Sequence, residues 1–133
     1  MSRLAYSVIE SKNHLHQRIM ASLRVQASWT DRESGNLISV AGLTENLGEN
    51  SALVNLDILP PVGSQVRLQI FDEDKAVIDI PTEVIRVERD PGKPLAALSI
   101  VENVKKWKEH ALSAAQSWVT RHWQLNYEEE WVN

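Results

Sequence analysis

Two arginines and a short polar stretch carry the residue types best suited to binding a phosphorylated ligand. Arg18 precedes the first strand-like segment, Arg24 begins it, and "NLGENS" (46–51) joins the next two such segments. The planar arginine fork binds phosphate oxygens bidentately, and its face stacks on bases. Small polar turns add side-chain oxygens and backbone N–H groups. The predicted ligand residues are therefore Arg18, Arg24, Asn46, Gly48 and Ser51. The alternative is a solvated hairpin loop, with the arginine stems lying over apolar surface.

Other kinds of chemistry have little support in the sequence. There is no cysteine, which excludes thiolate nucleophiles, disulfides and cysteine zinc sites. No Gly-rich phosphate loop or nucleophile elbow is present, so no catalytic residue and no enzyme activity is predicted. His14 and His16 with Glu10 lack a convincing third metal ligand. The run 72–74, "DED", lacks the glycine and spacing of a calcium loop. We therefore predict neither a metal nor a cofactor.

The composition is that of an ordinary globular chain. Its 133 residues fit one domain, with 43% hydrophobic and 24% charged residues. The net charge of −4 argues against direct binding of nucleic acid, which depends on clustered Lys and Arg. No apolar run approaches the ~20 residues that span a bilayer, and the first residues lack a signal-peptide core. We expect a cytoplasmic protein that does not contact a membrane.

Apolar and polar residues alternate with a period of two through most of the chain, which is typical of half-buried strands. Turn signals rich in Gly, Pro and Asp separate these segments. The pattern predicts a mainly β fold, a six-stranded antiparallel β-barrel. Its expected strands are 24–29, 37–44, 52–58, 65–71, 76–89 and 95–100.

The long segment 76–89 has an irregular pattern. Its inward-facing residues change parity, from Ala76, Ile78 and Ile80 to Ile85 and Val87. A bulge near Pro81 would explain the change, since proline cannot donate to the ladder. Arg86 and Arg89 on this segment either reach a ligand or pair with neighbouring carboxylates.

The last third of the chain changes to a helical period. Apolar residues recur every three or four positions from Val104 onward, which predicts an amphipathic helix across 104–120. We expect Trp107 and Trp118 to pack against the barrel. Trp123 and Trp131 are expected at a partner surface, because indole is favoured at interfaces. Trp118 lies close to Trp123 on the helix circumference, so Trp118 and Trp123 are the predicted dimer contacts.

The order of these elements resembles the PilZ domain over roughly residues 14–120. That family carries an RxxxR motif before its first strand and a [D/N]xSxxG motif between strands two and three. Here Arg18 and Arg24 stand at the arginine positions, six residues apart. Asn46 matches the first position of the second motif, while Gly48 and Ser51 occupy its serine and glycine positions. The resemblance implies a barrel with a long C-terminal helix that binds cyclic di-GMP, a bacterial second messenger.

These observations define an expected organisation and function. Residues 1–23 form an N-terminal basic segment, 24–100 the PilZ-like barrel, and 101–133 the C-terminal helix and tail. The expected function is that of a non-catalytic cyclic di-GMP receptor that signals to a protein partner of unknown identity. A homodimer with the ligand at or near its two-fold interface is also expected. The alternative is a PilZ-like protein-interaction module that has lost nucleotide binding.

Overall fold

The computed structural model describes residues 18–132, with side chains for residues 18–123. Glu10, His14, His16 and the side chain of Trp131 lie outside this range. None of the helices within it combines the length and hydropathy that crossing a bilayer requires.

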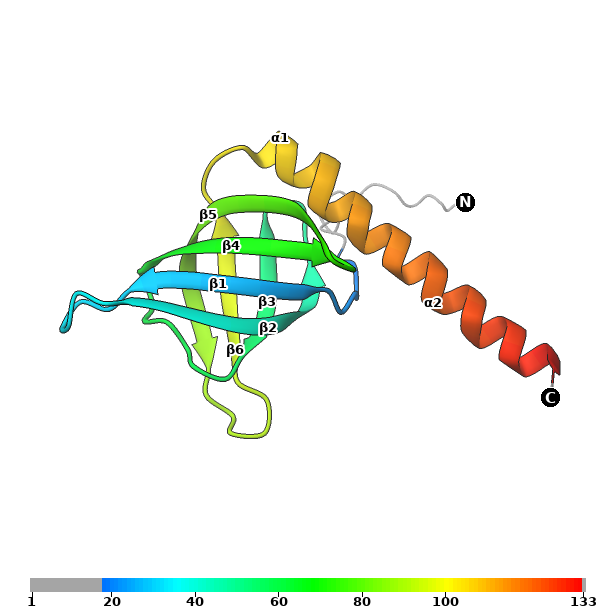
Figure 1. The fold of residues 1–133 in the computed structure, drawn as a ribbon, viewed down its shortest axis with the longest axis horizontal. Coiled ribbons are helices and arrows are strands. Elements are labelled where there is room, and N and C mark those ends of the chain that lie inside the picture. The colour runs from blue at the N-terminus through cyan, green and yellow to red at the C-terminus, as the bar shows by residue number, and fades with distance from the viewer. Residues whose placement is uncertain (1–17, 133) are drawn as a thin grey trace, which may run out of the picture.

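Six strands close into an antiparallel barrel, as the sequence predicts (Figure 1). Around the barrel the order is β1-β2-β3-β6-β5-β4, and β4 pairs back with β1. The strands are β1 (Arg24–Thr30), β2 (Leu37–Leu47), β3 (Ser51–Leu56), β4 (Gln65–Asp72), β5 (Lys75–Glu88) and β6 (Leu95–Ile100).

Alternating apolar side chains fill the interior of the barrel. Along β4, Val66, Leu68 and Ile70 are buried, while Gln65 and Arg67 on the opposite face are exposed. This alternation is the direct result of the two-residue period of a strand. The same pattern along the other strands produces one continuous hydrophobic core.

A helical segment follows β6 and covers one end of the barrel. It comprises α1 (Val104–Lys106), η2 (Trp107–Leu112), where the turns widen to π-helical geometry, and α2 (Ser113–Val132). The C-terminal part of α2 projects beyond the barrel (Figure 1). Trp107 is fully buried, as predicted, beside the buried Ala111 and Ala115. The small alanines let the helix lie close to the core.

Two strands contain an extra residue that reverses which side chains face outward. In β5 the pairing with β6 shifts between Val84 and Arg86, so the bulge lies at Ile85 and not near Pro81 as predicted. Pro81 pairs in register opposite Arg67. Ile85 is correspondingly 55% exposed rather than inward.

The inward row of β5 before this bulge is Ile78, Ile80, Thr82 and Val84, so Ala76, which is exposed, is not part of it. The buried Thr82 is satisfied because its hydroxyl donates to the Val66 carbonyl at 2.7 Å.

In β2 the pairing with β3 shifts between Thr44 and Asn46, which places a second bulge at Glu45. Thr44 and Leu47 are buried on either side of it, and Asn46 faces outward. Half of the polar stretch 46–51 is therefore strand. Its connecting loop is only 48–50, shorter than the pattern predicts.

Candidate functional site

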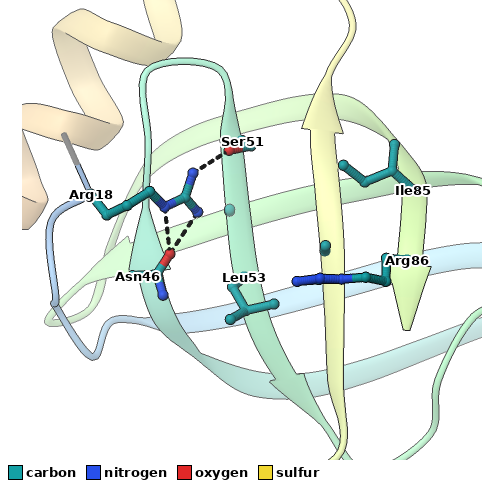
Figure 2. A pocket seen from close by; sticks show the side chains of 8 residues that line it. Arg18, Asn46, Ser51, Leu53, Ile85 and Arg86 are labelled. Carbon is teal, nitrogen blue, oxygen red and sulfur yellow. Dashed lines mark hydrogen bonds between the residues drawn. The ribbon is translucent and has the colours of Figure 1, made fainter. Parts of the chain in front are cut away.

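The polar stretch holds the guanidinium group of Arg18. Its Nε and Nη2 atoms donate to Asn46 Oδ1 at 2.8 and 2.6 Å. Its Nη1 atom donates to Ser51 Oγ at 2.5 Å (Figure 2). The bulge at Glu45 turns Asn46 outward, and Ser51 begins the next strand, so two neighbouring strands supply the acceptors.

Gly48 allows the arginine to lie this close. A Cβ atom at position 48 would lie 2.2 Å from Arg18 Nη1 and 3.0 Å from Arg18 Cζ. Such contacts are well inside van der Waals distance, so a side chain here would displace the guanidinium group. The structure thus brings together four of the five predicted ligand residues: Arg18, Asn46, Gly48 and Ser51.

The segment before β1 is fixed by backbone contacts to β2. Ile19 and Leu47 exchange two backbone hydrogen bonds, at 2.8 and 3.0 Å. The buried hydroxyl of Thr44 accepts from the Leu23 N–H at 2.9 Å and donates to the Ala21 carbonyl at 2.5 Å. These bonds satisfy buried polar groups and thereby fix the position of Arg18.

Arg18 borders a hollow of about 500 Å³ on the outer face of β2, β3, β6 and β5. A register row crosses this face: Asn46 pairs with Leu53, Leu53 with Ala97, and Ala97 with Arg86. The hollow therefore has an apolar centre with polar groups at both ends (Figure 2). Among the described residues, no carboxylate lines it.

The site is electropositive. Burial lowers the pKa of the Arg18 guanidinium from its ordinary value, and the nearby charge of Arg86 lowers this pKa further. Arginine nevertheless remains protonated in proteins. Three of the five N–H groups of Arg18 are used by Asn46 and Ser51. Two N–H groups, one on each terminal nitrogen, have no such bond within the described part of the chain.

Arg24 lies elsewhere. Its Nη2 atom donates to the Glu73 carbonyl at 2.6 Å and lies 3.5 Å from Asp74 Oδ1. Its guanidinium also lies 5.4 Å from the centre of the Phe71 ring. Arg24 pairs with Phe71 across β1 and β4, which directs it to the β4–β5 hairpin. The structure therefore does not bring it to the Arg18 group, and its contact with a ligand remains a prediction.

Arg86, which the sequence left open between a ligand and a carboxylate, lines the hollow. Its Nη2 atom also lies 3.3 Å from Glu88 Oε2, in a pair with both side chains about half exposed. The parity change in 76–89 places Arg86 on the outer face whether the bulge lies near Pro81 or at Ile85. What no sequence pattern shows is that barrel closure brings this part of β5 to the same face as β2 and β3, so the predicted site lacks Arg86.

The loop beneath Arg18 is also connected to the helix. The Trp107 indole Nε1–H donates to the Gly48 carbonyl at 2.9 Å, inside the core. The Ile100 N–H donates to the Asn50 carbonyl at 2.8 Å. The three-residue loop therefore contacts Arg18 on one side and the start of the helix on the other.

The two tryptophans predicted at an interface differ in their surroundings. Trp118 is half-buried against the core, and its ring stacks on His122 with 3.7 Å between centroids. Trp123 is 70% exposed. Their role in an interface remains a prediction.

These features define a class of protein: a closed six-stranded antiparallel barrel with a helix over one end and a cationic hollow on its outer face. No protein-family model and no curated protein matches the sequence.

Several solved structures resemble the fold. One is the inhibitor of motility MotI/DgrA of Bacillus subtilis, with TM-score 0.54 and 23% identity, covering 84% of this chain and 51% of the other. Another is the PilZ domain of CeSA from a cellulose-synthesizing bacterium, with TM-score 0.50 and 18% identity, covering 80% and 98%. The chain thus spans about half the length of the motility inhibitor and nearly all of the PilZ domain. Its fold is PilZ-like.

Proposed function

We propose that this chain is a non-catalytic cytoplasmic receptor for cyclic di-GMP that passes the second-messenger level to a protein partner. The observation that carries the proposal is the Arg18 guanidinium, held by Asn46 and Ser51 over the bare Cα of Gly48 at the edge of a cationic hollow. The PilZ-like fold supports it, because one of the similar structures is a PilZ domain.

The chemistry of the hollow suits such a ligand. Cyclic di-GMP has two phosphates and two guanine bases. The two remaining N–H groups of Arg18 suit a phosphate or the acceptor edge of a guanine, and the face of its guanidinium suits stacking on a base. Leu53 and Ala97 provide an apolar floor that a flat base can cover.

Transmission to a partner would pass through the loop 48–50. A ligand that moves Arg18 also changes the contact over Gly48, and the Gly48 carbonyl is bonded to Trp107 at the start of the helix. The helix is thus connected to the site through Gly48. We infer that ligand binding is communicated to the helix by this route, and that the exposed helix contacts the partner.

Isothermal calorimetry with cyclic di-GMP tests the proposal. The wild-type protein should bind, and Arg18→Ala should weaken binding about tenfold or more, since a charge-assisted hydrogen bond contributes about 1.5–3 kcal/mol. Arg67→Ala is the matched control, because Arg67 is an exposed arginine on an outer barrel face that pairs with Asp79 and does not line the hollow. It should leave the affinity unchanged within about twofold, which is the size of a remote surface effect. No binding by the wild-type protein would contradict the proposal.

The second candidate function is an interaction module that has lost nucleotide binding. It is favoured by the fact that Asn46 and Ser51 already satisfy three N–H groups of Arg18 without a ligand. In that case the arginine acts as a fixed structural contact. Calorimetry distinguishes the two, because Arg18→Ala would then lower the free energy of unfolding while no form of the protein binds the nucleotide.

A homodimer belongs to the same proposal. Trp123 is 70% exposed on a helix that projects from the barrel, and a two-fold dimer would present each such residue twice. Cyclic di-GMP itself has a two-fold axis, so a ligand at or near the dimer interface could contact the same residues of both chains.

A further inference from the structure

Two bulges of the barrel, at Glu45 and Ile85, turn one polar residue each toward the same hollow. Without the extra residue at Glu45, the inward alternation of β2 would place Asn46 inside the barrel after Thr44. Without the extra residue at Ile85, the alternation of β5 would place Arg86 inside after Val84. Bulges are known to redirect side chains beside binding sites. The bulge of β2 has an evident role, because Asn46 holds Arg18. The role of the bulge at Ile85, which turns Arg86 outward, is the question that remains.

The register places the two redirected residues at opposite ends of one row. Asn46, Leu53, Ala97 and Arg86 lie on four adjacent strands. Three strand spacings of ~4.8 Å separate the ends by about 14 Å along the sheet. In Figure 2 the side chain of Arg86 reaches from β5 toward Leu53, and Arg18 approaches from the opposite side.

We infer that Arg86 is the second ligand-binding cation of this site, and that Arg18 and Arg86 together select a ligand with two phosphates over one with a single phosphate. The inference rests on the proposed function and identifies a binding residue outside the predicted set. Leu53 and Ala97 lie between the two ends of the row, and both arginine side chains reach inward over this face (Figure 2). Two phosphates of one compact ring between the guanidinium groups, with a base over the apolar centre, match the hollow.

Two features leave Arg86 available for a ligand. Its only ion pair within the described residues is with Glu88 at 3.3 Å, and both side chains are about half exposed. Such surface pairs contribute little, so an incoming phosphate can replace the carboxylate. The neighbouring charge of Arg18 is of the same sign, and the ligand would relieve this repulsion.

Calorimetry with two nucleotides tests the inference. The probes are cyclic di-GMP, with two phosphates, and cyclic GMP, with one. Arg86→Ala should weaken cyclic di-GMP binding about 10- to 100-fold, as expected for loss of a charge-assisted contact. It should change the weaker binding of cyclic GMP by less than about threefold, the limit expected for a surface change away from the ligand. Arg86→Lys should recover part of the affinity, because it retains the charge but not the fork.

The matched control is Arg67→Ala. Arg67 is also a half-exposed arginine on an outer barrel face, paired with Asp79 at 2.7 Å, but it does not line this hollow. Glu88→Gln should strengthen cyclic di-GMP binding by about 1.5- to 5-fold, since it removes the competing carboxylate of an exposed pair. The affinity of Arg86→Ala should also depend less on NaCl concentration than that of the wild type, which a purely structural role would not produce.

The outcomes separate the two proposals. Wild-type binding that Arg86→Ala leaves unchanged would overturn this inference and leave the receptor proposal intact. Equal losses for cyclic di-GMP and cyclic GMP would overturn the selection between two phosphates and one. Absence of wild-type binding would overturn the receptor proposal, and this inference with it.

Discussion

At the scale of single residues, Gly48 and Ser51 meet two different requirements of the Arg18 site, which are space and a hydrogen-bond acceptor. Gly48 leaves room for the guanidinium group, and Ser51 supplies a hydroxyl acceptor at 2.5 Å. In the [D/N]xSxxG motif the serine and the glycine stand in the opposite order. In this chain the glycine and the serine therefore stand in exchanged positions relative to that motif.

Gly48→Ala tests the requirement for space. The backbone of Gly48 is not left-handed, so alanine causes no backbone strain there and its effect comes from the 2.2 Å contact with Arg18 Nη1. We expect the barrel to fold and the Arg18 side chain to leave Asn46 and Ser51. Cyclic di-GMP binding should fall about tenfold or more, which corresponds to loss of one charge-assisted contact.

Calorimetry and a structure of the Gly48→Ala variant provide the measurement. Gly92→Ala is the control, because a Cβ at position 92 meets its nearest atom at an ordinary 3.5 Å. Unchanged affinity in Gly48→Ala, with Arg18 still bonded to Asn46, would show that the site does not need a glycine.

At the scale of elements, the strands and the helix could be predicted from the sequence, whereas the hollow could not. Apolar residues recur every two positions along β4 and about every 3.6 positions from Val104, because these are the side chains that become buried. The sequence pattern therefore predicts both the strand and the helix. The hollow depends on two single-residue bulges, at Glu45 and Ile85, and on the barrel closure that makes β3 a neighbour of β6. No local pattern specifies which distant strands become neighbours.

Arg24 also shows that the sequence does not specify which strands become neighbours, because it was predicted at the site but lies elsewhere. Its residue type and position in the chain matched a phosphate-binding motif, but β1 pairs with β2 on one side and β4 on the other. The side chain of Arg24 lies on the β4 side, against Phe71. The short separation of Arg18 and Arg24 in the sequence therefore did not predict that their side chains lie beside different strands.

Trp107→Phe tests the connection between the loop and the helix. The substitution keeps an aromatic ring in the core but removes the indole N–H that donates to the Gly48 carbonyl. An unpaired buried carbonyl costs about 1–3 kcal/mol, so the free energy of unfolding should fall by at least that amount. The smaller ring adds a cavity contribution of its own.

Urea unfolding of the wild type and of Trp107→Phe measures the difference in the free energy of unfolding. Trp123→Phe is the control. Trp123 is 70% exposed, so the change in the free energy of unfolding there should stay within about 0.5 kcal/mol. Similar stability losses in the two variants would mean that the Trp107 hydrogen bond does not hold the loop to the helix.

At the scale of the whole molecule, the helix has two parts with different surroundings. Trp107, Ala111 and Ala115 are buried against the barrel, and the later part of α2 extends away from it (Figure 1). The loop 48–50 contacts the buried part through the hydrogen bond from Trp107 to the Gly48 carbonyl, so the residues beside Arg18 are connected to a helix that reaches beyond the barrel.

The exposed part of α2 predicts a homodimer with Trp123 in its interface. A large apolar side chain that is 70% exposed is stabilised when a second copy covers it, and a net charge of −4 opposes association only weakly because the Debye length is about 8 Å at physiological salt. Sedimentation at micromolar concentration should show a species near twice the 15.1 kDa chain mass. Trp123→Ala should shift it to the monomer. Leu37→Ala, which removes a side chain that is 71% exposed on β2, should not. A single 15.1 kDa wild-type species, with and without cyclic di-GMP, would rule out the dimer.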